Sequence, residues 1–232
     1  ATEPLSNATI FVTQPKVFAR CQNIYRLAKH AHAFRDTEVR VYRRAQNRGP
    51  GAARNFGIER CGGDILLCLD ADDRLRADAL QVVGSAISTH DLSMAVIGFV
   101  SDPPGQRFPD ATLFRTELRS ATDGVAIPHD ALRAASHPAF FMGRASNVAV
   151  RRDALGTYRY REDARMNEGV DLWYEVLKNI VGAKGRMGIV VEPLISFRIL
   201  PNSLSHRRPS DWRSLVVPPT VARLIDSTAP HD

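Results

Sequence analysis

The sequence has 232 residues, of which 44% are hydrophobic and 24% are charged, and it carries a net charge of +6. These values are ordinary for a soluble globular domain and exclude a disordered or fibrous chain. No apolar run approaches the roughly 20 residues that cross a bilayer, and the N-terminus lacks a secretion-signal pattern, so we expect neither a membrane span nor secretion. The positive charge favours an anionic partner, such as a nucleotide diphosphate, a nucleic acid or an acidic lipid surface.

The first hundred residues alternate between strand and helix patterns. Segments rich in Val, Ile, Leu and Phe and bounded by turn formers predict strands at 8–13, 38–43, 64–70 and 93–100. Apolar residues at steps of three and four, together with Pro and Gly at the ends, predict helices at 17–31, 50–60 and 76–89. This alternation predicts an α/β fold with a mostly parallel central sheet and helices on both faces.

The strand at 64–70 is apolar at every position from 65 to 69, which is typical of a central strand buried on both faces. From 103 to 138 the pattern weakens and prolines mark turns, so we expect a loop-rich insertion over the sheet. Regular structure is predicted again as a strand at 145–150, a helix at 168–181 and a strand at 188–197.

Three carboxylates directly follow or end the strand at 64–70: Asp70, Asp72 and Asp73. In extended backbone, residues two apart point the same way, so Asp70 and Asp72 can converge. Ligands of open parallel sheets bind beyond the carboxyl ends of the strands, which is where these residues fall. Their oxygen atoms suit Mg²⁺ or Mn²⁺, which proteins bind through one or two carboxylates plus substrate phosphates. The alternative is that Asp72 or Asp73 only caps the helix predicted from residue 76.

A Gly-rich loop enters the helix at 50–60, with Gly49, Pro50 and Gly51 at its start. Backbone N–H groups at a helix start can meet an anion, and Arg54 adds a planar cation that suits a phosphate. The loop is not a Walker loop, because Gly-Lys-Ser/Thr is missing, and it lacks the dinucleotide GxGxxG spacing. A plain helix entry explains the same residues without any ligand.

Several segments stand in a characteristic order and spacing: Asn47-Arg48-Gly49, Ala53-Arg54-Asn55-Phe56-Gly57, Gly63-Asp64-Ile65 and Leu69-Asp70-Ala71-Asp72-Asp73. Together they resemble the central block of family 2 glycosyltransferases. The segment 147–155 looks like the one that these enzymes carry before their catalytic helix. The segment 168–173 resembles the Glu-Asp motif at the start of that helix, and 192–194, 197–198 and 203–205 resemble the closing strand and loop.

The resemblance implies a GT-A-like, Rossmann-like fold with a loop-rich acceptor region, and a nucleotide-diphosphate sugar, expected to be a UDP-sugar, as donor. It implies that Asp70 and Asp72 hold Mn²⁺ or Mg²⁺ against the diphosphate, with His206 as a further metal ligand. A solvated basic loop is the alternative for His206. The donor-binding residues that it implies are Asn47, Gly49, Arg54, Asp70, Arg198 and Arg207.

Transfer with inversion needs one base that takes the proton of the acceptor hydroxyl. Aligned without gaps, Gly169 stands where the family usually has the Asp that acts as base. Glu168 and Asp171 lie three apart on one helix face, so either of them is a candidate catalytic residue. The alternative is that these acids only offset the helix dipole and face solvent. The family's Pro-x-Tyr-Asn and Asp-Asp-Gly-Ser motifs are absent from the N-terminal third, so no residue is assigned to the nucleotide base.

We therefore expect a metal-dependent inverting glycosyltransferase that acts on a carbohydrate or lipid-linked acceptor in polysaccharide or glycoconjugate synthesis. One domain is expected over 1–232, with a nucleotide-sugar half at 1–100, an acceptor and catalytic half at 101–208 and a tail at 209–232. We expect it in the cytoplasm, with peripheral contact at the inner face of the membrane as an option, and without a nucleic-acid partner. The alternatives are a sugar-phosphate nucleotidyltransferase and an inactive relative that binds a nucleotide-sugar or an anionic glycan.

Overall fold

The computed structural model describes residues 12–13, 42, 46, 48–70, 72–118, 122–143, 145–164 and 168–199. Its helices are α2 (Gly49–Arg60), α3 (Ala79–Thr89), α4 (Ala111–Thr116), α5 (Ala131–Ala135), the 3-10 turn η3 (Ala145–Asn147), α6 (Arg152–Leu155) and α7 (Glu168–Gly182). Its strands are β1 (Val12–Thr13), β2 (Ile65–Leu67), β3 (Leu69–Asp70), β4 (Arg74–Leu75), β5 (Met94–Asp102), β6 (Arg107–Phe108), β7 (Val125–Ala126), β8 (Val148–Arg151) and β9 (Met187–Arg198).

The main sheet has the strand order β2-β8-β5-β9-β4, with β6 paired to β5 and β7 paired to β9. Its longest pairing, between β5 and β9, is parallel, as is the separate pair of β1 and β3. The other described pairings are antiparallel. The α/β class is confirmed, but the described sheet is mixed rather than mostly parallel. Short strands of the 103–151 region and β4 join it without the crossover helices that parallel pairing requires.

The segment predicted as one buried strand at 64–70 is divided at Cys68. Its first part, β2, pairs with β8, whereas its second part, β3, pairs with β1. β2 lies at one end of the main sheet as described, and Leu66 is its one buried residue. The expectation of a central strand buried on both faces is therefore wrong, because β2 lies at one end of the sheet as described and every residue of β2 and β3 except Leu66 is only partly buried.

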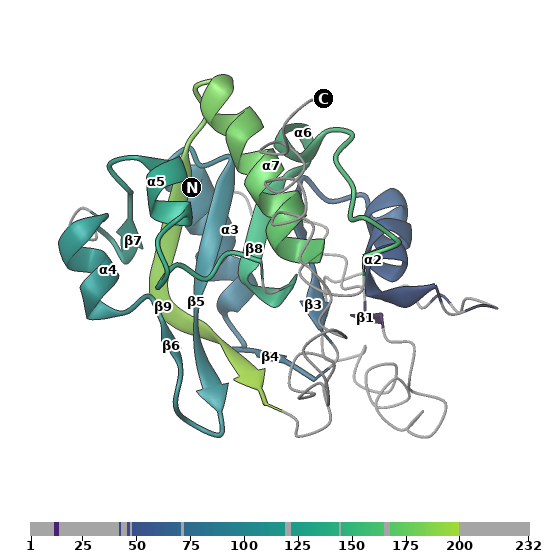
Figure 1. The fold of residues 1–232 in the computed structure, drawn as a ribbon, viewed down its shortest axis with the longest axis horizontal. Coiled ribbons are helices and arrows are strands. Elements are labelled where there is room, and N and C mark those ends of the chain that lie inside the picture. Colours follow the sequence, from purple (N-terminus) through teal and green to yellow (C-terminus); the bar gives the residue numbers. More distant parts are fainter. Residues whose placement is uncertain are drawn as a thin grey trace, which may run out of the picture.

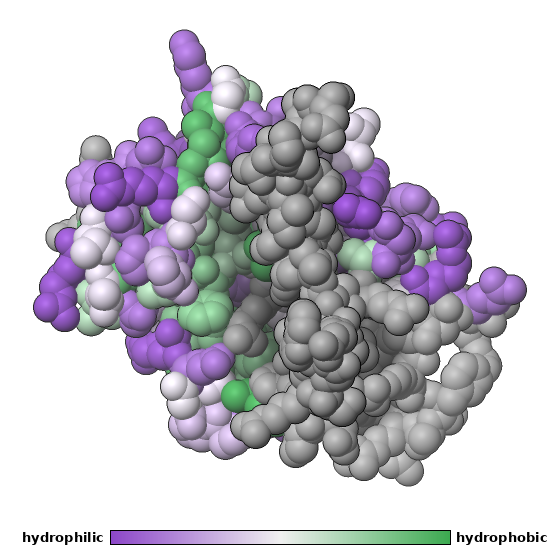
Figure 2. Space-filling model, in the orientation of Figure 1, coloured by the Kyte–Doolittle hydropathy of each residue, from purple (hydrophilic) through white to green (hydrophobic). Residues whose placement is uncertain are grey.

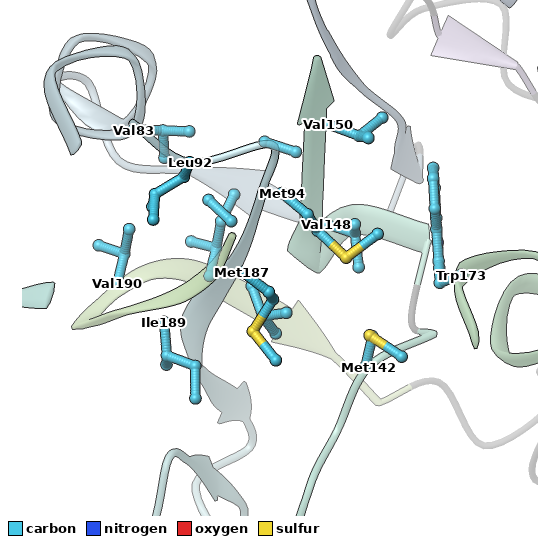
Figure 3. Packing of buried hydrophobic residues seen from close by; sticks show 14 of the residues in the cluster. Val83, Leu92, Met94, Met142, Val148, Val150, Trp173, Met187, Ile189 and Val190 are labelled. Atoms are coloured by element: carbon cyan, nitrogen blue, oxygen red, sulfur yellow. The ribbon is translucent and has the colours of Figure 1, made fainter. Parts of the chain in front are cut away.

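Helices cover both faces of the sheet (Figure 1). α3 packs on β5 and β9 from one side, while α7 lies on the other side, where α5 and α6 pack against it. Figure 3 shows side chains from both layers meeting at the sheet, with Val83 of α3 beyond one face and Trp173 of α7 beyond the other. This two-sided burial fixes the α7 axis relative to the strands, and so the position of the acids at its start.

Other elements differ from expectation in detail. α2 and α7 begin within one residue of their predicted starts, but α3 begins at Ala79 rather than at 76. The reason is that residues 74–75 form β4, and Arg76 turns its side chain to Asp78 and Glu192. The insertion at 103–138 contains α4 and α5. The predicted helix at 17–31, and most of the predicted strands at 8–13 and 38–43, lie outside the described residues.

The described surface is uneven in polarity. In Figure 2 hydrophilic residues dominate the two flanks of the molecule, and hydrophobic residues appear between them. Among the described residues, none of the helices is both long and apolar enough to cross a bilayer.

Candidate functional site

The turn that carries Asp70, Asp72 and Asp73, here the carboxylate turn, is fixed by buried and partly buried hydrogen bonds. The backbone N–H of Asp73 donates to the carbonyl of Asp70 at 3.1 Å, which closes the turn. The Ser146 hydroxyl donates to Asp73 Oδ2 at 2.5 Å and accepts from the Asp70 N–H at 3.0 Å. The Arg198 N–H, at the end of β9, donates to Asp73 Oδ1 at 3.2 Å. Asp73 therefore connects the turn to η3 and β9 and does not cap α3, whose N-cap residue is Asp78.

Asp73 is only 8% exposed, so its ionised carboxylate loses most of its contact with water. Burial raises its pKa to about 6, against the hydrogen bond from Ser146, and the nearby charge of Asp70 adds to the rise.

Asp70 and Asp72 are half-buried and close enough for their charges to interact. Burial, and then the charge of Asp70, raise the pKa of Asp72, while the charge of Arg198 lowers it. A divalent cation would offset this repulsion, so the pair fits the metal that it was predicted to hold. Among the described residues no group of three or more His, Cys, Asp or Glu side chains gathers in metal-binding geometry. A cation held by Asp70 and Asp72 therefore stays a prediction, and it would take its other ligands from substrate phosphates or water.

Arg54 joins the turn to α7. Its Nη2 pairs with Asp70 Oδ1 at 2.9 Å and its Nη1 pairs with Glu168 Oε1 at 2.5 Å, although its side chain is only 9% exposed. Burial by itself lowers the pKa of Arg54, but Asp70, Tyr160 and Glu168 raise it above its usual range. The guanidinium also lies 5.2 Å from the ring centre of Tyr160. The predicted anion-binding arginine therefore faces two carboxylates of its own chain.

Asn55, the next residue of α2, anchors the same region. Its Nδ2 donates to the Tyr160 carbonyl and its Oδ1 accepts from the Tyr160 N–H, both at 2.9 Å. A Cβ at Gly51 would lie 2.7 Å from the Arg161 carbonyl oxygen, so this segment packs directly on the helix backbone. The first turns of α2 therefore pack against and hydrogen-bond to the backbone of residues 160–161.

Both candidate acids at the start of α7 are buried, Glu168 being 8% exposed and Asp171 5% exposed. The alternative that they face solvent is wrong, because α7 turns this side of its first turn toward the protein interior. Asp171 lies near Arg161, since after Asp163 its charge contributes to the raised pKa of that arginine. Glu168, in contrast, is linked to Asp70 by the guanidinium of Arg54, which forms an ion pair with both carboxylates. The structure thus connects Glu168 to the carboxylate turn through Arg54.

Gly169 has no space for a side chain. A Cβ at this position would collide with the carbonyl oxygen of Gly143, and a Cβ at Gly143, whose φ is +136°, would lie 2.5 Å from Val170 Cγ2. The backbone of the loop before η3 thus touches the first turn of α7. This contact gives a physical reason for glycine at 169.

The comparisons with known proteins bear on this arrangement. The model of the glycosyl transferase family 2 matches residues 22–157, which is more than half of the chain. The chain belongs to glycosyl transferase family 2. The matched part of this family member contains Arg54, the carboxylate turn and Ser146, and it ends before Glu168 and Asp171.

A curated protein of Haemophilus influenzae described as an uncharacterized glycosyltransferase is 40% identical over 47 residues, 20% of this chain and 19% of that protein. The structure of S. aureus TarS 1-349 in complex with UDP-GlcNAc has a TM-score of 0.60 at 17% identity, covering 90% of this chain and 54% of that one. GalNAc-T7 with UDP, GalNAc and Mn²⁺ has a TM-score of 0.50 at 13% identity, covering 83% and 37%. These likenesses confirm the GT-A fold. The family member spans about half of the TarS chain and a fifth of the H. influenzae protein.

Of the donor-binding residues expected in this family member, the structure places Gly49 at the first position of α2 and Arg198 at the end of β9 beside Asp72. Asn47, His206 and Arg207 lie outside the described residues. Asn55 and Ser146 were not predicted as site residues. Asn55 follows Arg54 directly in the segment Ala53-Arg54-Asn55-Phe56-Gly57, whereas Ser146 lies 73 residues from Asp73 and carries no local signal.

Proposed function

We propose that this chain transfers a sugar from a nucleotide-diphosphate donor, with UDP as the expected nucleotide, to an acceptor hydroxyl with inversion and with the help of a divalent cation. The observation that carries the proposal is that Asp70, Asp72 and Glu168 occupy one site, with Arg54 between Asp70 and Glu168. The shared fold with structures described as complexes of UDP-GlcNAc and of UDP with Mn²⁺ supports this class of donor.

At the donor end, Asp70 and Asp72 are the residues that would hold Mn²⁺ or Mg²⁺. When bound, such a cation stabilises the negative charge that develops on the leaving nucleotide diphosphate. Ser146 and Asp73 hold the turn in place, so its carboxylates need little reorganisation. Arg198 lies beside Asp72, where its guanidinium is suited to a phosphate oxygen.

At the acceptor end, one carboxylate must come within hydrogen-bond reach of the hydroxyl that attacks the sugar. Of the two candidates, we favour Glu168, because Arg54 fixes it relative to Asp70, whereas Asp171 lies toward Arg161. Arg54 engages Oε1 of Glu168, and a carboxylate has a second oxygen that can accept a proton. The acceptor as a glycan or lipid-linked molecule, polysaccharide synthesis and a cytoplasmic or membrane-face location all stay predictions.

Thermal unfolding with a panel of nucleotide-sugars, with and without Mn²⁺, tests the donor half of the proposal. A ligand that binds only the native state stabilises it by about 2.7 kcal/mol at a hundred times its Kd. We expect UDP-sugars to raise Tm when Mn²⁺ is present, and we expect Asp72→Asn to abolish this rise. A UDP-sugar effect that is equal without metal and in Asp72→Asn would contradict the metal assignment.

Transfer assays test the acceptor half. We expect Glu168→Gln to lower kcat by about a hundredfold or more, since general base catalysis contributes on that order, while UDP binding persists. Asp171→Asn is the matched control from the same helix turn and should have the smaller effect. The reverse ranking would assign the base to Asp171, and unmodified rates in both variants would contradict an acid of α7 as base.

A binding protein without turnover is the second candidate, and Gly169 favours it, because the family's usual base position cannot hold a side chain here. In that case the protein would bind UDP-sugar with Mn²⁺ but would neither transfer the sugar nor hydrolyse the donor. Measurable hydrolysis or transfer that is lost in Asp72→Asn would exclude this candidate.

A further inference from the structure

Both terminal nitrogens of Arg54 are committed to carboxylates of the chain itself. Nη1 forms an ion pair with Glu168 and Nη2 forms one with Asp70, two acids that are 98 positions apart in the sequence (168 − 70). The side chain is buried against the ring of Tyr160, so it has little freedom to turn toward a ligand. A planar guanidinium holds two carboxylates in a defined geometry, which a lysine cannot do.

On the basis of the function proposed above, we propose that Arg54 is a positioning residue, a resident cation that fixes Glu168 against Asp70 and competes with the divalent cation for Asp70. This role differs from the direct contact with the donor diphosphate that the sequence predicts for Arg54. The two roles predict different affinities for Mn²⁺ and UDP in the double variant, in which both Glu168 and Arg54 are replaced.

The charges of the site make this difference measurable. Asp70, Asp72 and Glu168 each carry −1 and Arg54 carries +1, so these four groups sum to −2. Arg54→Met changes the sum to −3, Glu168→Gln changes it to −1, and the double variant restores −2. Arg198 adds the same positive charge to every variant, so the differences between variants are unaffected.

Binding of Mn²⁺ alone, measured by electron paramagnetic resonance of the free ion, is the first readout and needs no turnover. We expect Arg54→Met to bind Mn²⁺ about tenfold more tightly than the unmodified protein and Glu168→Gln about tenfold more weakly, as expected for one unit charge at short range. The double variant should lie within a few-fold of the unmodified protein. A merely structural arginine would not tighten Mn²⁺ binding when removed, so unchanged or weaker binding in Arg54→Met would overturn the proposal.

Binding of UDP at saturating Mn²⁺, measured by calorimetry, is the second readout. Arg54→Met should weaken it about tenfold, because an uncompensated carboxylate then faces the anionic nucleotide, and the double variant should recover to within a few-fold of the unmodified protein. If Arg54 contacts the diphosphate directly, the double variant stays as weak as Arg54→Met, and the proposal is wrong. Should Arg54→Met not fold, the double variant still decides, because it must bind Mn²⁺ more tightly than Glu168→Gln and UDP as well as the unmodified protein.

Arg152→Met is the matched control. Arg152 is also partly buried, but its guanidinium donates to the backbone carbonyls of Cys61 and Gly63 at the end of α2. Its replacement should lower stability and leave the affinities of the folded protein for Mn²⁺ and UDP unchanged. An unmodified protein that binds neither ligand would overturn the proposed function, whereas equal affinities in all four proteins of the Arg54–Glu168 cycle would overturn the role of Arg54 alone.

Discussion

At position 169 the need for glycine comes from the neighbouring backbone of Gly143 and not from the helix that contains Gly169. Glycine lowers the stability of a helix interior by roughly 0.5 to 1 kcal/mol relative to alanine. In this chain it permits the contact between α7 and the carbonyl of Gly143, which any side chain would block. The family's usual aspartate therefore cannot be restored here without moving the loop before η3.

Gly169→Asp should consequently destabilise the protein and fail to raise activity. We expect a loss of about 2 to 4 kcal/mol in the free energy of unfolding, measured by urea denaturation, because the loop or the helix start must shift. Gly182→Ala is the control at the other end of α7, where a Cβ meets nothing within 4 Å, and it should be neutral or slightly stabilising. Equal effects of the two substitutions would contradict the close contact.

Asp73 gives a pH dependence that can be measured directly. Its native pKa of about 6 lies above the value of about 3.9 expected in the unfolded chain, so between these pH values the native state holds the proton more firmly. The stabilisation from the neutral form is complete below about pH 3.9 and is lost as the pH rises through 6. Over this window Asp73 should lower the free energy of unfolding by about 2 to 3 kcal/mol.

The measurement is urea unfolding of the unmodified protein and of Asp73→Asn between pH 4 and pH 7. The difference between the two curves isolates Asp73 from the other carboxylates, and the slope due to Asp73 should be absent in the variant. Parallel curves across this range would contradict the raised pKa.

At the scale of elements, α2 acts as the connector of the site. Two consecutive residues of this helix make the connecting contacts. The Arg54 side chain pairs with Asp70 and with Glu168 of α7, and the Asn55 side chain hydrogen-bonds to the backbone of Tyr160. At its far end, Arg152 donates to carbonyls that the helix leaves without intrahelical partners. The helix thus depends on later parts of the chain at both ends.

Asn55→Ala should therefore destabilise the fold, because it removes both hydrogen bonds to the backbone of Tyr160 and a longer one to Glu162. The buried backbone N–H and C=O of Tyr160 then lose that partner. We expect a loss of about 2 to 4 kcal/mol in urea unfolding. Arg76→Ala, which removes exposed ion pairs with Asp78 and Glu192, is the surface control and should shift the midpoint much less. A larger loss in the control would contradict the connecting role of Asn55.

At the scale of the whole molecule, the sequence was sufficient for what local pattern and motif spacing determine. The α/β class, the starts of α2 and α7 and the position of Asp70 and Asp72 at the end of a strand and just after it followed from apolar periodicity and from the resemblance. The division of the strand at Cys68 and the mixed pairing of the sheet could not be predicted, because the strand with which each segment pairs lies far away in the sequence. The Arg54–Glu168 pair and the Ser146–Asp73 bond span 114 and 73 residues, a separation at which one sequence contains no signal of contact.

The affinity for Mn²⁺, measured with and without UDP, tests whether Asp70 and Asp72 hold a cation against the donor diphosphate. If Asp70 and Asp72 hold a cation against the diphosphate, each ligand must tighten the other by the same factor. We therefore predict that UDP increases Mn²⁺ affinity at least about tenfold in the unmodified protein, and that Asp72→Asn removes this coupling. Mn²⁺ and UDP that bind independently of one another in the unmodified protein would contradict the assignment of Asp70 and Asp72.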